Sequence, residues 1–258
     1  MGDVGRFLPH RPFFQGMAME MMEFSTLPRE QLERMADAGA RILECYRVLG
    51  KAGMNVVGEV LRGQGEFIEF EHYPRDDVFD TETHSQYYYH AHRGEAGEHG
   101  HFHTFLRQPG MPNGAHPLDY VGDEPWPHGK DAISHLIGIS MDAYGFPVGL
   151  FTTNRWVTGE TWYPAHDVTK MLDRFHIDHA WPSWPVNIWI SSMLILFRPQ
   201  IEDLLRTRDQ VIAEWMGKNP GADVFEDRSL ELTGYTPISV ERQIKSIVQA
   251  LEPVSIAG

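Results

Sequence analysis

The sequence of 258 residues contains a single cysteine, Cys45, and this shortage excludes several classes of site. One cysteine cannot form an intramolecular disulfide, and it cannot supply a zinc ribbon or a four-cysteine iron–sulfur cluster. Cys45 lies within an apolar helical pattern, so we expect a buried and unreactive thiol. Any metal that this chain binds is therefore expected to have nitrogen and oxygen ligands.

Positive charge is also scarce, because 22 Lys and Arg residues stand against 36 Asp and Glu residues, for a formal net charge of −14. No basic stripe is available to neutralise nucleic-acid phosphates or anionic lipid headgroups. We therefore expect neither a nucleic acid nor a membrane as a partner, and a small molecule as the substrate. The sequence leaves the oligomeric state open.

Long apolar runs are missing as well. The longest, residues 186–197, contains Asn187, Ser191 and Ser192 and is too short to cross a bilayer, so it predicts a buried core helix. Near the start of the chain, Pro9 and Pro12 interrupt the stretch in which a secretory signal needs continuous apolar residues. These features predict a cytoplasmic protein.

Several common catalytic motifs are absent from the sequence. It has no GxxxxGK[ST] phosphate loop and no GxGxxG motif after a strand, so nothing indicates a bound nucleotide. It also has no HExxH zinc motif and no GxSxG nucleophile elbow. The chemistry of this chain must be carried by some other arrangement of residues.

Hydrophobic periodicity divides the chain into helices, a sheet and further helices. The predicted helices are residues 28–50, 55–62, 166–175, 186–197, 199–216 and 240–251, the last with Ser239 as its N-cap. The predicted strands are residues 66–73, 85–93, 99–107, 135–141 and 148–154.

This order of elements predicts the fold class. We expect one α+β domain over residues 1–258, with an antiparallel sheet of about five strands between residues 66 and 154, flanked by N-terminal and C-terminal helices. Residues 1–25 are predicted to be an irregular N-terminal arm. Residues 108–130 hold five prolines and four glycines, which predicts a long loop.

Histidine is abundant where cysteine is scarce, and six of the 14 histidines lie between residues 84 and 103. Alternate residues of a strand share a face, so His90 and His92 point the same way, as do His101 and His103 on the next strand. An antiparallel pairing of His92 with His101 would place His90 opposite His103 and bring four imidazoles together. We therefore predict that His90, His92, His101 and His103 bind one transition-metal ion.

The residue types around this cluster suggest which metal it takes. Neutral imidazole is a common ligand of iron, copper and zinc. An all-imidazole site beside a tyrosine favours Fe(II) or copper, and zinc stays open. Glu98 and Tyr88 are the predicted catalytic groups, with Tyr88 as a phenol on the same strand face. Glu95 or Glu98 could add a carboxylate ligand or act as a general base to a metal-bound water. The competing interpretation is a hydrogen-bonded histidine network without metal.

Two local resemblances accompany the cluster. His90-x-His92 followed closely by a glutamate resembles the first half of the cupin metal motif. A His-x-His pair with a facing histidine on an antiparallel strand is similar to the three-histidine zinc site of the alpha-type carbonic anhydrases. Both resemblances are confined to residues 90–103 and assign no family.

Residues outside the cluster add weaker signals. Arg155 and Trp156 follow the strand at residues 148–154, where sheets often present groups to a ligand, so we predict that they bind substrate. His176 and Asp178 have the spacing of part of an iron(II) facial triad, but no histidine after His179 completes it. The roles of His84, His99, His176 and His179 stay open.

Together these patterns predict a metal-dependent enzyme that acts on a small organic molecule through a mononuclear, multi-histidine transition-metal site. Oxygenase-like oxidoreductase chemistry is favoured. The alternatives are a zinc-dependent hydrolase or hydratase, and a non-catalytic metal-binding protein.

Overall fold

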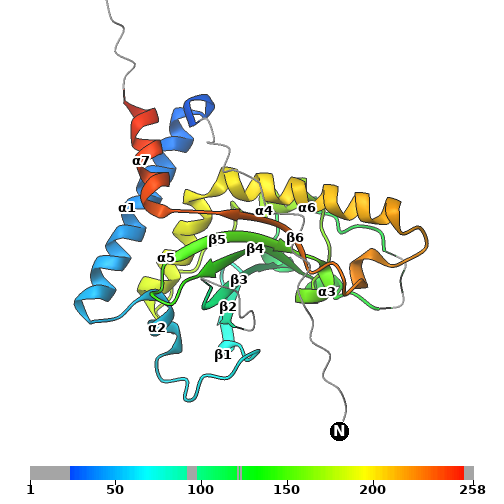
Figure 1. Ribbon diagram of the computed structural model, residues 1–258, viewed down its shortest axis with the longest axis horizontal. Helices are drawn as coiled ribbons and strands as arrows, with labels where there is room; N and C mark the ends of the chain where they lie inside the picture. The colour runs from blue at the N-terminus through cyan, green and yellow to red at the C-terminus, as the bar shows by residue number, and fades with distance from the viewer. Residues whose placement is uncertain (1–23, 92–97, 121, 123, 253–258) are drawn as a thin grey trace, which may run out of the picture.

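The computed structural model describes residues 24–91, 98–120, 122 and 124–252 (Figure 1). Within these ranges the chain forms seven α-helices and one antiparallel sheet of six strands, arranged in chain order, so the predicted α+β class is confirmed. The strands are β1 (Tyr73–Phe79), β2 (Ser85–His90), β3 (Gly100–Arg107), β4 (Ile133–Met141), β5 (Pro147–Thr153) and β6 (Leu232–Pro237). The helices are α1 (Arg29–Lys51), α2 (Val56–Leu61), α3 (Arg155–Thr158), α4 (Ala165–Met171), α5 (Trp184–Leu196), α6 (Arg198–Lys218) and α7 (Val240–Leu251).

Most predicted elements appear at their expected places, with two kinds of difference. The strand predicted at residues 66–73 is wrong, because β1 begins only at Tyr73. Ile68 and Phe70 alternate with polar residues, but their side chains are 52% and 68% exposed, so no buried face stabilises a strand there. The sequence predicts neither strand β6 nor the short helix α3. Strand β6 contains both Gly234 and Pro237, two residues that are uncommon in strands.

Helices α5 and α6 cover one face of the sheet (Figure 1). The ring of Trp189 in α5 packs on Phe102 of β3, with ring centroids 5.7 Å apart, and the Tyr87 hydroxyl of β2 donates to Asn187 Oδ1 at 2.6 Å. Helix α5 is apolar on all sides because α1 packs against it as well. The buried Cys45 of α1 joins this core, as expected, and burial raises the pKa of its thiol to about 11.

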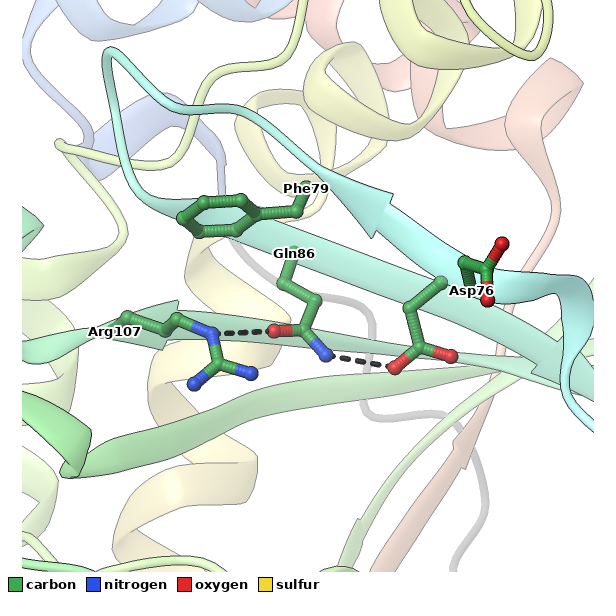
Figure 2. A pocket seen from close by; sticks show the side chains of 5 residues that line it. Asp76, Phe79, Gln86 and Arg107 are labelled. Atoms are coloured by element: carbon green, nitrogen blue, oxygen red, sulfur yellow. Dashed lines mark hydrogen bonds between the residues drawn. The ribbon is translucent and has the colours of Figure 1, made fainter.

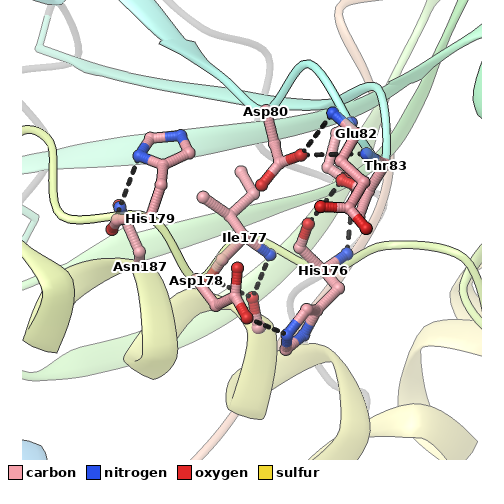
Figure 3. A network of polar contacts seen from close by, with 10 residues as sticks. Asp80, Glu82, Thr83, His176, Ile177, Asp178, His179 and Asn187 are labelled. Atoms are coloured by element: carbon pink, nitrogen blue, oxygen red, sulfur yellow. Dashed lines mark hydrogen bonds and ion pairs between the residues drawn. The ribbon is translucent and has the colours of Figure 1, made fainter.

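A polar network attaches the turn between β1 and β2 to the segment that precedes α5 (Figure 3). Asp80 Oδ1 accepts hydrogen bonds from the backbone N–H groups of Glu82 and Thr83. The Thr83 hydroxyl in turn donates to the backbone carbonyl of His176 at 2.6 Å. These bonds satisfy buried polar groups at the edge of the sheet, so the network orients β2 relative to the helices.

The remaining predictions on organisation have mixed outcomes. The described part of residues 108–130 contains neither an α-helix nor a strand; it begins with one 3-10 helix and ends within another, which agrees with the predicted loop. Nearly all of the predicted arm, residues 1–23, lies outside the described residues. The single-domain organisation stays a prediction. Among the described residues, no helix has the length and apolar character that crossing a membrane requires.

Candidate metal centre

Three of the four predicted histidines, His90, His101 and His103, lie on the face of the sheet opposite to α5. On β2 this face carries Tyr88 and His90, and on β3 it carries His101 and His103, whereas Tyr87 and Phe102 point to the helices. Alternation along each strand produces this division. The sequence therefore assigns the histidines to one face correctly.

Three histidines from two neighbouring strands form a compact group. The ring centroids of His90 and His101 lie 4.5 Å apart, and His103 lies 5.2 Å from His90 and 5.1 Å from His101. One nitrogen from each ring falls within 4.8 Å of the others. All three residues are buried, with at most 9% of their surface exposed. This group could hold a metal ion.

The strand register differs from the predicted one. His90 pairs with His101 and Tyr88 pairs with His103, so the prediction that His92 faces His101 and His90 faces His103 is wrong. The shift is two residues, which leaves every side chain on its expected face. Sequence alternation determines the face, but it does not determine which residues are opposite each other. His92 lies outside the described residues.

Two of the three imidazoles are oriented by partners, the half-buried Glu98 and the buried His135. His101 Nδ1 lies 2.6 Å from Glu98 Oε1, and His103 Nδ1 lies 3.0 Å from Nε2 of His135 in β4. Because these contacts occupy Nδ1, Nε2 is the nitrogen through which each ring can bind a metal. Such partners fix the tautomer and the orientation of metal-binding histidines. Glu98, predicted as a catalytic base, thus lies beside His101 as an orienting carboxylate; a catalytic role stays a prediction.

A β-bulge brings His135 to this face. Thr104 pairs with Ile137, whereas the next residue of β3, Phe105, pairs with His135, so Leu136 is an extra residue in β4. Without that extra residue, His135 would point to the opposite face, away from His103. Burial lowers the pKa of His135 to about 3, so its ring is neutral and can accept a hydrogen bond from His103. Sequence reasoning missed His135, because strand alternation does not reveal a bulge.

Tyr88, the second predicted catalytic residue, lies against the cluster. Its ring centroid is 5.2 Å from those of His90 and His103, and the ring of His72 stacks on it at a centroid distance of 3.6 Å. Burial raises the pKa of Tyr88 well above its usual value, which keeps the phenol protonated near neutral pH. The structure thus places Tyr88 beside the histidines, and its role in catalysis stays a prediction.

The buried carboxyl group of Glu160 contacts the backbone of His135. Glu160 Oε2 accepts a hydrogen bond from the backbone N–H of His135 at 2.6 Å, and the side chain is fully buried. Burial raises the pKa of Glu160 to about 7, although Arg208 and Arg155 act in the opposite direction. A perturbed carboxyl group close to a histidine cluster is typical of functional sites. The sequence places Glu160 just past the strand at residues 148–154, but it does not predict that this carboxyl group is buried beside His135.

One aromatic side chain, Phe151, packs against two of the three histidines. The ring of Phe151 in β5 meets His101 and His103 at centroid distances of 5.2 and 5.5 Å. Phe151 pairs with Gly138 of β4, and its ring lies over the space that a side chain at residue 138 would fill. The absence of a side chain at Gly138 therefore allows Phe151 to lie close under the histidines.

The two residues predicted to bind substrate have internal partners. Arg155 forms an ion pair with Glu226 and donates from Nε to the Glu160 carbonyl at 3.0 Å. Trp156 Nε1 donates to the Leu230 carbonyl at 2.8 Å. The structure does not bring either side chain into the group of three histidines. Substrate binding by Arg155 and Trp156 stays a prediction.

The other candidate histidines lie apart from the group. His84 occupies a turn with a positive φ of 61°, and His99 Nδ1 lies 2.6 Å from the Tyr89 hydroxyl. His176 pairs with Asp178 at 3.4 Å within the network of Figure 3, where His179 also lies. None of these four histidines belongs to the three-histidine group found among the described residues.

Comparison with known proteins assigns a family without an activity. No curated protein and no solved structure matches the chain significantly. A family model does match, over residues 36–238, and this range contains the whole sheet and every residue of the cluster. The chain belongs to the DUF6969 family, which is described as a domain of unknown function.

Proposed function

We propose that His90, His101 and His103 bind one transition-metal ion, and that the protein is a metal-dependent enzyme acting on a small organic molecule. One observation carries the proposal: three buried imidazoles converge, with their candidate ligand nitrogens within 4.8 Å of one another. Burying several imidazoles side by side is unfavourable if they become charged. A bound cation would hold them in the neutral form and use their lone pairs.

The donor set fits a first-row transition metal. Imidazole nitrogen suits iron, copper and zinc, and three protein ligands leave coordination positions for water or a substrate. We favour Fe(II) or copper, with oxygenase-like oxidoreductase chemistry, and zinc is the alternative metal. When bound, the metal would supply a Lewis acid and, for iron or copper, a redox centre.

The chain's own residues have defined tasks in this proposal. In this arrangement Glu98 accepts a hydrogen bond from His101 Nδ1–H, and His135 Nε2 accepts one from His103 Nδ1–H, so both rings would present Nε2. Phe151 packs against His101 and His103 and limits the access of water. Tyr88 keeps a protonated hydroxyl on the same face, as a donor for a bound substrate.

Burial favours a second candidate, a non-catalytic metal site. His101 and His103 are 0% and 1% exposed, and a structural metal is usually enclosed and fully coordinated. An added small anion such as azide distinguishes the two functions. Azide should change the spectrum of a metal with an open position and leave a fully coordinated metal unchanged. A zinc-dependent hydrolase or hydratase would instead have a spectroscopically silent metal.

Metal analysis of the purified full-length protein tests the proposal. The wild-type protein, purified with and without oxygen, should carry about one equivalent of a transition metal, and His101→Ala should lose it. His116→Ala is the matched control, because His116 is exposed and lies outside the group. A wild-type protein that remains metal-free after incubation with Fe(II), Cu(II) and Zn(II) would refute the proposal. Equal metal content in His101→Ala would refute this assignment of the ligands.

A further inference from the structure

A pocket lies on the same sheet face, at the opposite end of β2 and β3 from the histidines. Its volume is about 390 Å³, and it is lined by Asp76, Asp77, Phe79, Gln86 and Arg107 (Figure 2). This size is within the range of sites that bind small organic molecules. These residues come from three different strands, so no local sequence pattern connects them.

Two consecutive hydrogen bonds hold the guanidinium group of Arg107 in this pocket. Arg107 Nε donates to Gln86 Oε1 at 2.7 Å, and Gln86 Nε2 donates to Asp77 Oδ2 at 2.7 Å. Gln86 is only 7% exposed, so its amide is held in place by packing as well as by both bonds. The guanidinium plane is therefore oriented before any ligand arrives, which lowers the entropy cost of binding.

The orientation leaves the two terminal nitrogens of Arg107 for a ligand. For Arg107, Figure 2 draws only the bond from Nε to Gln86, and the terminal nitrogens form no hydrogen bond with a described residue. Two adjacent guanidinium N–H groups match the two oxygens of a carboxylate. The Phe79 ring lies 5.6 Å from Arg107 Cζ and adds an apolar surface beside this donor pair.

The acidic residues of the pocket indicate which second charged group a ligand should carry. Both oxygens of Asp77 have partners, Gln86 and His72. Asp76 is exposed, and its carboxylate has no hydrogen bond or ion pair within the described part of the chain. The pocket thus offers one cationic donor pair and one carboxylate acceptor. A simple anion would be repelled by Asp76 and Asp77, and a simple cation would leave the donor pair of Arg107 without a partner.

We propose that this pocket binds a small zwitterion that carries a carboxylate and an ammonium group. Arg107 holds the carboxylate, Asp76 attracts the ammonium, and Phe79 packs on the methylene groups between them. Gln86 is a positioning residue that acts through Arg107. The proposal goes beyond the proposed metal function and does not depend on it, because none of these residues belongs to the three-histidine group.

Calorimetric titration of the full-length protein tests the proposal. The probes are glycine, 4-aminobutanoate and 6-aminohexanoate, compared with butanoate and butylamine, which each carry one of the two charges. At least one zwitterion should bind saturably, about tenfold or more tightly than either singly charged compound. No saturable binding by any of the three zwitterions, or equal binding by butanoate, would overturn the proposal.

Variants assign the binding to Arg107. Arg107→Leu and Arg107→Lys should each weaken binding about tenfold or more, because lysine keeps the charge but loses the paired donors. Arg41→Leu removes the same charge from an exposed position in α1 and should leave binding unchanged. If Arg107→Leu does not fold, Arg107→Lys carries the test, and wild-type affinity in that variant refutes the assignment. His101→Ala should bind normally, which separates this test from that of the metal centre.

Discussion

Replacing Gly138 by alanine should disturb the histidine cluster through the ring of Phe151. An alanine Cβ at this position would lie less than 3.0 Å from three ring carbons of Phe151, closer than real side chains approach. Phe151 is fully buried and already contacts His101 and His103. The ring would have to move by about 1 Å to reach an ordinary contact distance. That movement changes the contacts of the ring with the two histidines.

The expected change in the free energy of unfolding follows from two opposing effects. Overpacking a buried site typically costs about 1–3 kcal/mol. Alanine in a strand regains about 0.5–1 kcal/mol relative to glycine, because glycine loses more backbone freedom on folding. The net loss in the free energy of unfolding should be about 1 kcal/mol and at most about 2.5 kcal/mol, and each kcal/mol lowers the melting temperature by about 2–4 °C for a chain of this size. Metal affinity should fall by about tenfold or more, since Phe151 supports two of the ligands.

Urea unfolding and a metal titration against a chelator measure these effects. Gly50→Ala is the matched control, because Gly50 lies in α1 with nothing within 4 Å of a new Cβ, so alanine should stabilise that helix slightly. Phe151→Leu should relieve the clash, so the double variant Gly138→Ala/Phe151→Leu should be less destabilised than the sum of the single variants. Wild-type stability and metal affinity in Gly138→Ala would refute this reasoning.

Three further predictions concern groups at increasing distance from the metal centre. Glu98→Gln should weaken metal binding about 10–100-fold, because it removes the charged partner of His101; a chelator competition that gives the wild-type affinity would contradict this. Burial raises the pKa of Glu160 from 4.5 to about 7, so the folded protein binds this proton more tightly than the unfolded chain. The free energy of unfolding should therefore fall as the pH rises from about 4.5 to about 7, and urea unfolding of Glu160→Gln should show a smaller fall. Ser239→Ala should cost about 1 kcal/mol in urea unfolding, because the Ser239 side chain caps α7 by accepting a hydrogen bond from the Arg242 N–H; an unchanged midpoint would argue against this cap.

The elements that the sequence predicts well are those with a strong local pattern. Helix α7 begins and ends where periodicity and the Ser239 cap placed it, and β2 to β5 appear within a few residues of their predicted bounds. Strand β6 has no comparable pattern, because it is short and is stabilised by pairing with β5, which lies far away in the sequence. Pairing partners of this kind cannot be inferred from local periodicity.

In the candidate site, too, the sequence predicts the features that depend on local alternation and misses those that depend on how distant segments pair. Alternation places His90, His101 and His103 on one face, because the side-chain period of a strand is two residues. The register and the bulge at Leu136 depend on how three strands pair, so the predicted pairing was wrong and His135 was missed. Glu160 was missed for a related reason, since only the folded structure buries it beside β4.

X-ray absorption at the metal edge of the metal-loaded protein tests the central claim most directly. The account predicts a first shell of nitrogen and oxygen atoms at about 2.0–2.2 Å, with the outer-shell scattering that imidazole rings produce, fitted by three histidines. His101→Ala should reduce the fitted imidazole number or abolish metal loading, and His116→Ala should change neither. A first shell without imidazole scattering, or the wild-type spectrum in His101→Ala, would contradict the claim that these three histidines bind the metal.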